Sequence, residues 1–267
     1  MKLAFSPCPN DTFVFHAWTH GLIPGAPPVE ITYADIDVTN TAAERGEFDV
    51  VKVSYAALPW LLDDYRLLPT GGALGRGCGP LVLTRGGPTN VDGLTVAVPS
   101  ERSTAYLLFR LWAAGQRPAR IDVVPFAEIM PAVRDGRYDA GLVIHEARFV
   151  YQDYGLHALV DLGEWWESDT GLPIPLGAIL AKRELDADHL TAVIRASVEH
   201  AWANPAAPAA YIAEHAAEMS PDVQRRHIDL YVNEFTRDLG EDGYAAVEAL
   251  LGRAHKEGLI PADPAIR

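Results

Sequence analysis

The sequence contains few cysteines, few basic side chains and no long apolar run. Its 267 residues include only Cys8 and Cys78 as cysteines, so a disulfide framework is excluded, and no Cys-x-x-Cys pair is present. Lys and Arg total 22 against 36 Asp and Glu, which gives a formal net charge of −14. Binding of DNA or RNA phosphates requires clustered basic side chains, so the composition argues against a nucleic-acid partner.

No segment of the sequence is suited to cross a membrane or to direct export. The most apolar candidate, residues 171–181, is interrupted by Pro173 and Pro175 and is shorter than the roughly 18 residues that span a bilayer. Before the first proline-rich loop the N-terminus offers only the apolar run Leu3–Phe5, whereas a signal peptide needs about 7–15 apolar residues. We therefore expect a cytoplasmic protein without membrane insertion.

Common cofactor and catalytic motifs are also missing. The sequence has no Gly-x-Gly-x-x-Gly, no Gly-x-x-x-x-Gly-Lys-Ser/Thr, no Gly-x-Ser-x-Gly and no His-Glu-x-x-His, so nucleotide cofactors and serine-hydrolase chemistry are poorly supported. His16 and His20 lie four residues apart on a predicted helix and could face one metal ion. No carboxylate or cysteine completes such a site locally, so we interpret both as ordinary helix residues and expect no metal.

The remaining pattern predicts an α/β fold. An apolar fraction of 49% over 267 residues is typical of a packed protein with one or two domains. In the first half short apolar strands alternate with helices, which indicates parallel sheets covered by helices, whereas Ala-rich helices follow residue 185. Gly71–Pro80 has too many glycines for a helix or a strand and is expected to be a loop. The predicted strands are 2–5, 31–34, 48–53, 81–84, 93–99, 140–144 and 176–181, and the predicted helices are 12–20, 39–46, 103–114, 188–202, 206–218, 221–235 and 241–257.

A short internal repeat suggests two similar α/β units. Residues 45–50, Arg-Gly-Glu-Phe-Asp-Val, recur in altered form at residues 135–140 as Asp-Gly-Arg-Tyr-Asp-Ala, in each case between a predicted helix and an apolar strand. The alternative interpretation, a helix end followed by a buried strand, is compatible with this one. We therefore expect one unit formed by residues 1–90 and 175–267, and a second formed by residues 91–174.

Two polar residues lie at strand ends, where open α/β sheets bind ligands. Ser54 ends a predicted strand of the first unit and His145 ends one of the second, so a cleft between the units would bring them face to face. Imidazole has an ordinary pKa of about 6.5 and exchanges protons near neutral pH, and Glu146 follows directly. A core histidine that donates to a carbonyl is the alternative. Asp11 is a weaker candidate base because an ordinary aspartate pKa is about 3.9.

Helix starts provide candidate anchors for a carboxylate substrate. Ser103 and Thr104 begin a predicted helix, and the segments Asn10–Thr12 and Ser54–Tyr55 offer the same arrangement in the first unit. The free N–H groups of a helix start suit a negatively charged ligand. Capping is the more frequent role of such residues and remains the alternative.

Two cations could add charge to this site. Lys52 lies two residues before Ser54, on the same face of the predicted strand, and an inward lysine is costly unless it is paired with an anion. Its alternative is to reach solvent or a local aspartate. Arg76 in the glycine-rich segment favours an anion-facing loop because arginine holds carboxylates with two hydrogen bonds. A flexible surface loop is the alternative.

Several longer segments resemble one enzyme family. The chain is similar to the 1,4-dihydroxy-6-naphthoate synthases of the futalosine route to menaquinone, from residue 3 to about residue 185 and more weakly through the C-terminal helices. Taken together, the matching segments are highly specific for this family. They are Phe5-Ser6-Pro7-Cys8-Pro9-Asn10-Asp11-Thr12-Phe13, Lys52-Val53-Ser54-Tyr55-Ala56, Gly71-Gly72-Ala73-Leu74-Gly75-Arg76-Gly77, Thr104-Ala105-Tyr106, residues 141–149 (Gly-Leu-Val-Ile-His-Glu-Ala-Arg-Phe) and residues 171–177 (Gly-Leu-Pro-Ile-Pro-Leu-Gly).

The resemblance implies a fold, a reaction and a set of site residues. The fold would be the two-domain type II periplasmic-binding-protein-like fold with a ligand cleft between the domains. The reaction would be that of a lyase, which converts cyclic dehypoxanthinylfutalosine to 1,4-dihydroxy-6-naphthoate without a cofactor and releases a small sugar-derived fragment. The family's histidine base falls on His145, and its ligand-contacting segments fall on Lys52, Val53 and Ser54 and on Ser103 and Thr104.

Two other functions are compatible with the same scaffold. One is a solute-binding protein without catalysis, and the missing export signal counts against it. The other is the related chorismate dehydratase, which carries out a different reaction. His145 and the Ser-Pro-Cys-Pro-Asn-Asp loop at residues 6–11 favour the naphthoate synthase.

Overall fold

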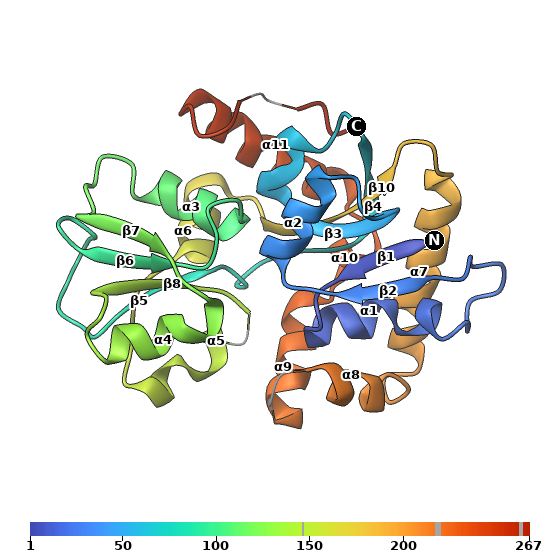
Figure 1. The fold of residues 1–267 in the computed structure, drawn as a ribbon, viewed down its shortest axis with the longest axis horizontal. Coiled ribbons are helices and arrows are strands. Elements are labelled where there is room, and N and C mark those ends of the chain that lie inside the picture. The colour runs from blue at the N-terminus through green and yellow to red at the C-terminus, as the bar shows by residue number, and fades with distance from the viewer. Residues whose placement is uncertain (146, 217–219, 262–263) are drawn as a thin grey trace.

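The chain folds into two α/β lobes that lie side by side (Figure 1). The computed structural model describes residues 1–145, 147–216, 220–261 and 264–267. Both chain ends belong to the lobe that also carries the C-terminal helices (Figure 1). Each lobe contains one mixed sheet covered by helices, so the predicted α/β class is confirmed.

The first sheet has the strand order β2-β1-β3-β10-β4. Strand β1 lies between β2 and β3 and is parallel to both, whereas β10 is antiparallel to the central strand β3 and to β4. In the register Leu3 of β1 lies opposite Ile31 of β2 and Val50 of β3, so apolar side chains adjoin across these three strands. Its strands are β1 (Lys2–Phe5), β2 (Glu30–Tyr33), β3 (Val50–Ser54), β4 (Tyr65–Gly75) and β10 (Ile174–Lys182).

The second sheet repeats this arrangement with the order β7-β6-β8-β5-β9. Here β6 is parallel to β7 and β8, and β5 is antiparallel to β8 and β9. The sequence predicted parallel sheets, whereas each sheet contains one antiparallel strand, β10 in the first and β5 in the second. Both strands enter their sheet from the other lobe, and each runs opposite to its two neighbours. The strands are β5 (Leu81–Thr84), β6 (Thr95–Val98), β7 (Arg120–Val123), β8 (Ala140–Val143) and β9 (His157–Asp161).

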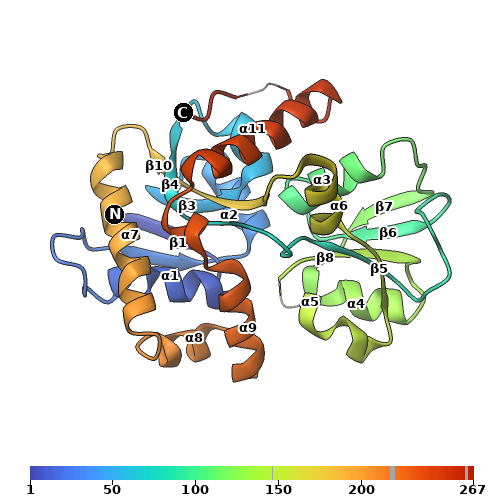
Figure 2. The ribbon, with the colours of Figure 1, turned by 180° about the vertical axis from the view of Figure 1, so that it is seen from behind.

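Helices cover both sheets and begin close to the predicted positions. In the first lobe α1 contacts α7, α8 and α9, which flank it (Figure 2). No helix among the described residues is long and apolar enough to cross a membrane. The helices are α1 (Pro9–Thr19), α2 (Ile36–Glu44), η1 (Tyr55–Trp60), α3 (Thr104–Trp112), α4 (Phe126–Arg134), α5 (Ala147–Val150), η2 (Tyr151–Tyr154), α6 (Leu162–Thr170), α7 (Ala187–Ala203), α8 (Ala209–His215), α9 (Pro221–Tyr231), α10 (Glu234–Arg237) and α11 (Gly240–Lys256).

The glycine-rich segment is only in part the loop that the sequence predicted: β4 continues through residues 71–75, and residues 76–80 lie outside any helix or strand. A Cβ atom on Gly72 would lie 2.7 Å from the carbonyl oxygen of Gly177, and one on Gly71 would lie 2.8 Å from Ile194. The glycines therefore allow β10 and α7 to approach the strand closely, which is a packing requirement and not a sign of flexibility.

The chain passes between the lobes twice, between β4 and β5 at residues 76–80 and between α6 and β10 at residues 171–173. The sequence placed Leu81–Thr84 in the first unit, with a boundary near residue 90, whereas this strand pairs in the second sheet. The misplacement arose because the glycine-rich segment was interpreted as an internal loop of the first unit.

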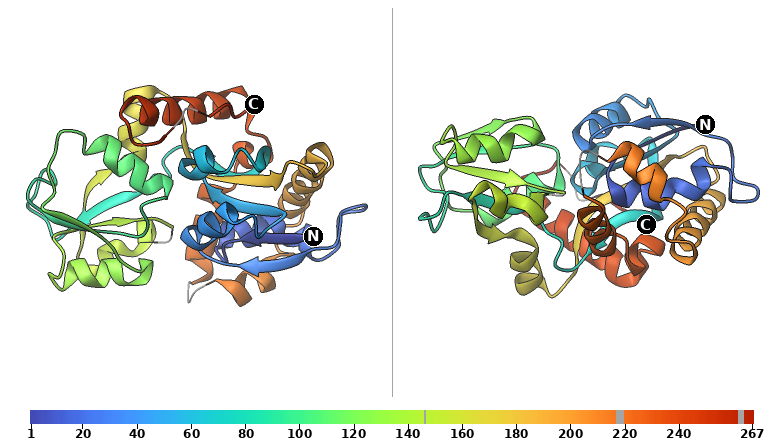
Figure 3. Two further views of the ribbon diagram at one scale, coloured as in Figure 1. Left: turned by 45° about the horizontal axis from the view of Figure 1, so that its top comes forward. Right: turned by 90° about the horizontal axis from the view of Figure 1, so that it is seen from below.

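A third link between the lobes comes from α11, which lies across the top of the molecule (Figure 3). Arg253 on α11 forms an ion pair with Asp169 on α6, and its guanidinium carbon lies 5.1 Å from the ring centroid of Trp165. Since α6 directly precedes the return crossing, α11 and the two crossing segments join the lobes along one side.

Candidate active site

A cleft of about 650 Å³ lies between the lobes, at the ends of β3 and β8. A second hollow of about 850 Å³ adjoins this cleft and shares Ile36, Ser103, Ile144 and His145 with it. Of the predicted site residues, the cleft brings together Asn10, Asp11, Lys52, Ser54, Ser103, Thr104 and His145.

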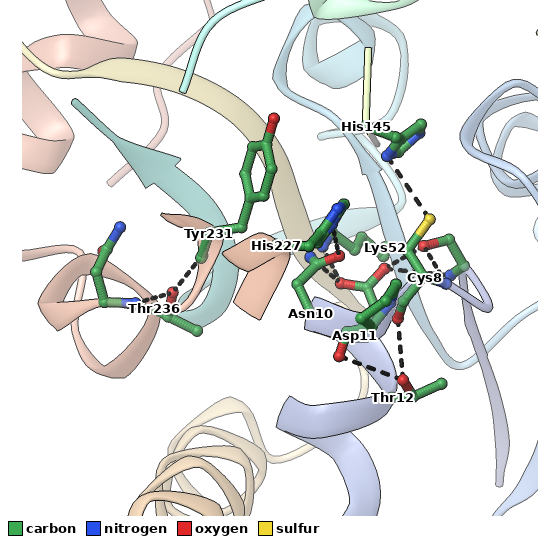
Figure 4. Close-up of polar contacts among 12 residues, drawn as sticks. Cys8, Asn10, Asp11, Thr12, Lys52, His145, His227, Tyr231 and Thr236 are labelled. Atoms are coloured by element: carbon green, nitrogen blue, oxygen red, sulfur yellow. Dashed lines mark hydrogen bonds and ion pairs between the residues drawn. The ribbon is translucent and has the colours of Figure 1, made fainter. Parts of the chain in front are cut away.

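The floor of the cleft is a buried ion pair between Lys52 and Asp11 (Figure 4). The two residues are 5% and 1% exposed. The Asp11 carboxylate also accepts hydrogen bonds from Ser6 N at 3.3 Å, Ser6 Oγ at 2.6 Å and Asn10 Nδ2 at 2.8 Å. The inward lysine therefore has its anion inside the protein, and a buried pair with so many additional donors meets the condition under which such charges are tolerated.

Local sequence explains how this pair is placed. The helix α1 begins at Pro9, with Cys8 at the N-cap position, so Asp11 lies in its first turn, where a carboxylate is favoured by the helix dipole. The sequence predicted a helix over residues 12–20, and the helix in fact begins three residues earlier. Opposite, a Cβ atom on Gly177 would lie 2.9 Å from Lys52 Cε, so the glycine of β10 leaves room for the lysine stem.

His145 reaches the cleft from the second lobe. It follows β8 with a φ of 53°, in the left-handed region, which a non-glycine residue rarely adopts without a functional or structural reason. Its Nδ1 atom lies 3.6 Å from Cys8 Sγ of the first lobe, and its ring packs edge-on against Phe126. Glu146, which follows this histidine in the sequence, lies outside the described residues.

The hydroxyl residues of the cleft also link the two lobes. Thr104 Oγ1 on α3 donates to the carbonyl oxygen of Leu176 at 2.8 Å and accepts from the backbone N–H of Ala56 at 3.2 Å. Ser103 caps α3 by accepting from Tyr106 N at 3.1 Å. The capping interpretation of Ser103 therefore holds, while Thr104 is a bridge between the lobes.

Asn40 on α2 is a polar contact that the sequence did not single out. Its Oδ1 accepts from Ser54 N at 2.8 Å, and its Nδ2 donates to Ser54 Oγ at 3.2 Å and to the carbonyl oxygen of Arg102 at 3.3 Å. Arg102 in turn forms an ion pair with Glu44. These bonds fix the Ser54 backbone and hold the edge of α2 against the second lobe.

Two of the predicted substrate-binding residues do not line the cleft. Val53 is fully buried in the first sheet opposite Ala178. Arg76 lies in the first crossing segment with its side chain 53% exposed, where it donates to the carbonyl oxygen of Gly171 and lies 3.6 Å from Glu167. The guanidinium thus joins the two crossing segments and does not face a ligand in the cleft.

His227 and Tyr231 of α9 line the cleft and were missed by the sequence reasoning. His227 is 1% exposed, and its Nε2 atom lies 3.0 Å from Asn10 Oδ1. Burial, together with the nearby charges of His145 and Lys52, lowers the pKa of His227 to about 3. The two residues lie one turn apart on a largely polar helix, and nothing in the neighbouring sequence marks them as part of a binding site.

The other reactive side chains contribute no further centre. Burial raises the pKa of the Cys78 thiol to about 12, so this cysteine is not a nucleophile near neutral pH. The rings of His16 and His20 contact each other in the first lobe, with centroids 4.4 Å apart and planes tilted by 33°. Among the described residues no group of three or more His, Cys, Asp or Glu side chains is arranged to hold a metal ion. The cleft therefore presents one partly exposed imidazole above a buried, hydrogen-bonded polar floor.

Comparison with known proteins agrees with the similarity noted in the sequence. A family model described as menaquinone biosynthesis matches residues 1–256. A protein of Streptomyces coelicolor named 1,4-dihydroxy-6-naphthoate synthase is 66% identical over 98% of this chain and 95% of its own length. A protein of Thermus thermophilus with the same name is 45% identical over 99% of this chain and 97% of its own length.

Solved structures confirm the predicted periplasmic-binding-protein-like fold. A protein from Archaeoglobus fulgidus superimposes with a TM-score of 0.91 at 33% identity, covering 97% of this chain and 98% of that one. The alkanesulfonate-binding protein of Xanthomonas axonopodis, bound to MOPS, superimposes with a TM-score of 0.72 at 14% identity, covering 100% and 96%. The second likeness concerns the fold alone.

The buried ion pair leads to a prediction about the stability of the protein. Replacing Asp11 by Asn leaves the Lys52 ammonium buried without its anion, which typically costs about 3–5 kcal/mol of unfolding free energy. The double variant Asp11→Asn with Lys52→Met removes both charges and should recover part of that loss. Urea denaturation of the wild type, both single variants and the double variant measures the coupling. Losses that simply add in the double variant would contradict a direct interaction.

Proposed function

The chain belongs to the menaquinone biosynthesis family of enzymes, and we propose that it is a carbon–carbon lyase, a 1,4-dihydroxy-6-naphthoate synthase. Its substrate would be cyclic dehypoxanthinylfutalosine, a small carboxylate, and its products the naphthoate and a sugar-derived fragment. The observation that carries the proposal is the position of His145, which extends from one lobe over the polar floor of the other. The cytoplasmic location stays a prediction.

His145 would act as the general base. Formation of an aromatic ring from a cyclic precursor requires that a proton leaves as the carbon–carbon bond breaks. An imidazole takes up such a proton more readily at neutral pH than an ordinary carboxylate does. Asp11 is unsuited to this role because its carboxylate is buried and already accepts from Lys52, Ser6 and Asn10.

Lys52 and Ser54 would anchor the substrate carboxylate. The ammonium has three N–H donors, and its bond to Asp11 leaves the others for a ligand that enters the cleft. Ser54 Oγ accepts from Asn40, so its own proton can be donated to the carboxylate. Charge-assisted hydrogen bonds of this kind are the strong ones in a binding site. Arg76, which lies away from the cleft, has no part in this anchor.

The direct test is turnover. The purified protein is incubated separately with cyclic dehypoxanthinylfutalosine and with chorismate, and the products are identified by mass. We expect the naphthoate from the first substrate and no conversion of the second. Dehydration of chorismate would favour the related dehydratase. Binding of the first substrate without any product would favour a solute-binding role on the same scaffold.

The proposed role of His145 as general base leads to a prediction about kcat. His145→Asn keeps the approximate size and a polar group but removes the proton acceptor, and loss of a general base typically lowers kcat by about 10²–10⁴-fold. Substrate affinity measured by calorimetry should remain within about tenfold of the wild type. Turnover of this variant at a near-wild-type rate would assign the base to another group.

The proposed role of Ser54 in holding the substrate carboxylate leads to a prediction about KM. Ser54→Ala removes one hydrogen bond to a charged group, which is worth about 1.5–3 kcal/mol, so KM should rise by about tenfold or more. Arg76→Gln serves as the matched control, because it changes a polar side chain outside the cleft and should leave KM within about threefold. Steady-state kinetics gives the KM of both variants. Equal KM values in the two variants would show that Ser54 does not anchor the substrate carboxylate.

A further inference from the structure

His227 is a buried polar residue of the cleft that the proposed reaction has not used. Its ring stacks at 6.5 Å and 14° on that of His145 and packs 4.6 Å from the ring of Tyr231. Its Nδ1 atom is buried and has no hydrogen-bond partner among the described residues. A buried acceptor or donor without a partner is unfavourable, and native proteins retain few of them without a reason.

The neighbours of His227 determine which ring nitrogen carries the proton. The ionised Asp11 carboxylate can only accept hydrogen bonds, so the group that Asn10 directs towards it must be its amide NH₂. The amide oxygen of Asn10 then faces His227 Nε2 at 3.0 Å, and this oxygen can also only accept. Nε2 must therefore carry the hydrogen, and Nδ1 holds a lone pair. The Lys52–Asp11 pair thus sets the tautomer of His227 through one intervening side chain.

The charge of His227 follows from its surroundings. Burial and the neighbouring His145 and Lys52 lower its pKa to about 3, so the ring stays neutral throughout the pH range in which the enzyme would work. A group with so low a pKa holds an additional proton poorly, which makes it a hydrogen-bond acceptor and not a second general base.

We infer that His227 Nδ1 accepts a hydrogen bond from a hydroxyl group of the substrate and thereby orients it beside His145. The inference rests on the proposed function, in which the substrate carries a hydroxyl-bearing, sugar-derived ring. A fixed acceptor selects for a donor: a substrate with a hydroxyl at this position is bound, and an analogue with an ether or a carbonyl there is rejected, because the lone pairs face each other.

Two substitutions separate this role from simple packing. In His227→Gln the longer amide can place its N–H near the former Nε2 and keep the bond to Asn10, but no acceptor replaces Nδ1. In His227→Asn the amide oxygen lies close to the former Nδ1, and the bond to Asn10 is lost. We expect the Gln variant to raise KM by about tenfold or more with kcat changed less than about threefold, and the Asn variant to stay closer to the wild type.

The opposite order, with Asn the more impaired variant, would overturn the inference, as would a wild-type KM in a folded Gln variant. NMR of the ¹⁵N-labelled, ligand-free wild-type protein provides a readout that does not depend on turnover. The ring nitrogens of His227 should show the Nε2–H tautomer and no titration between pH 5 and pH 8. A proton on Nδ1 would overturn the inference whatever the kinetics show. A wild-type protein without turnover would contradict the proposed function, whereas a proton on Nδ1 in an active protein would overturn the inference alone.

Discussion

The buried ion pair between Lys52 and Asp11 is the constraint on which the rest of the cleft depends. Neither charge could remain buried alone, so the first turn of α1 is held against β3. That placement positions Cys8 opposite His145 and orients the Asn10 amide towards His227. A single electrostatic pairing inside the first lobe therefore sets the geometry of groups that belong to three separate segments of the chain.

The two lobes meet through polar contacts beside the cleft and through apolar packing of α3 against η1 and β10. Thr104 bonds to backbone groups of the first lobe, and Asn40 and Glu44 on α2 contact Arg102 of the second. These contacts lie beside the cleft, so the side chains that join the lobes also fix the geometry of the site. Ser103 and Thr104 at the start of α3 show the overlap of these roles: the first caps the helix, the second bonds to the other lobe, and both line the cleft.

Much of the fold could be read from the sequence because its signals are local. Apolar strands followed by helices predicted the two α/β units, and His145 was conspicuous because a polar residue ends an apolar strand. The strand through Gly71 and Gly72 was missed because the reason for those glycines is the close approach of β10 and α7, which are distant in sequence. His227 was missed for the same reason: its significance comes from Asn10, more than 200 residues away. The expectation for Arg76 was wrong because its partners Glu167 and Gly171 are also distant in the sequence.

The link through α11 determines how the molecule can open. Arg253 joins this helix to α6, and the two crossing segments run between the same lobes, so one side of the molecule is tied three times. The opposite side, where α2 meets residues 99–103, is closed by an exposed ion pair and a few hydrogen bonds. Because one side is tied three times, we expect the lobes to separate first where α2 meets residues 99–103, beside the hollow that Ile36 and Phe126 line.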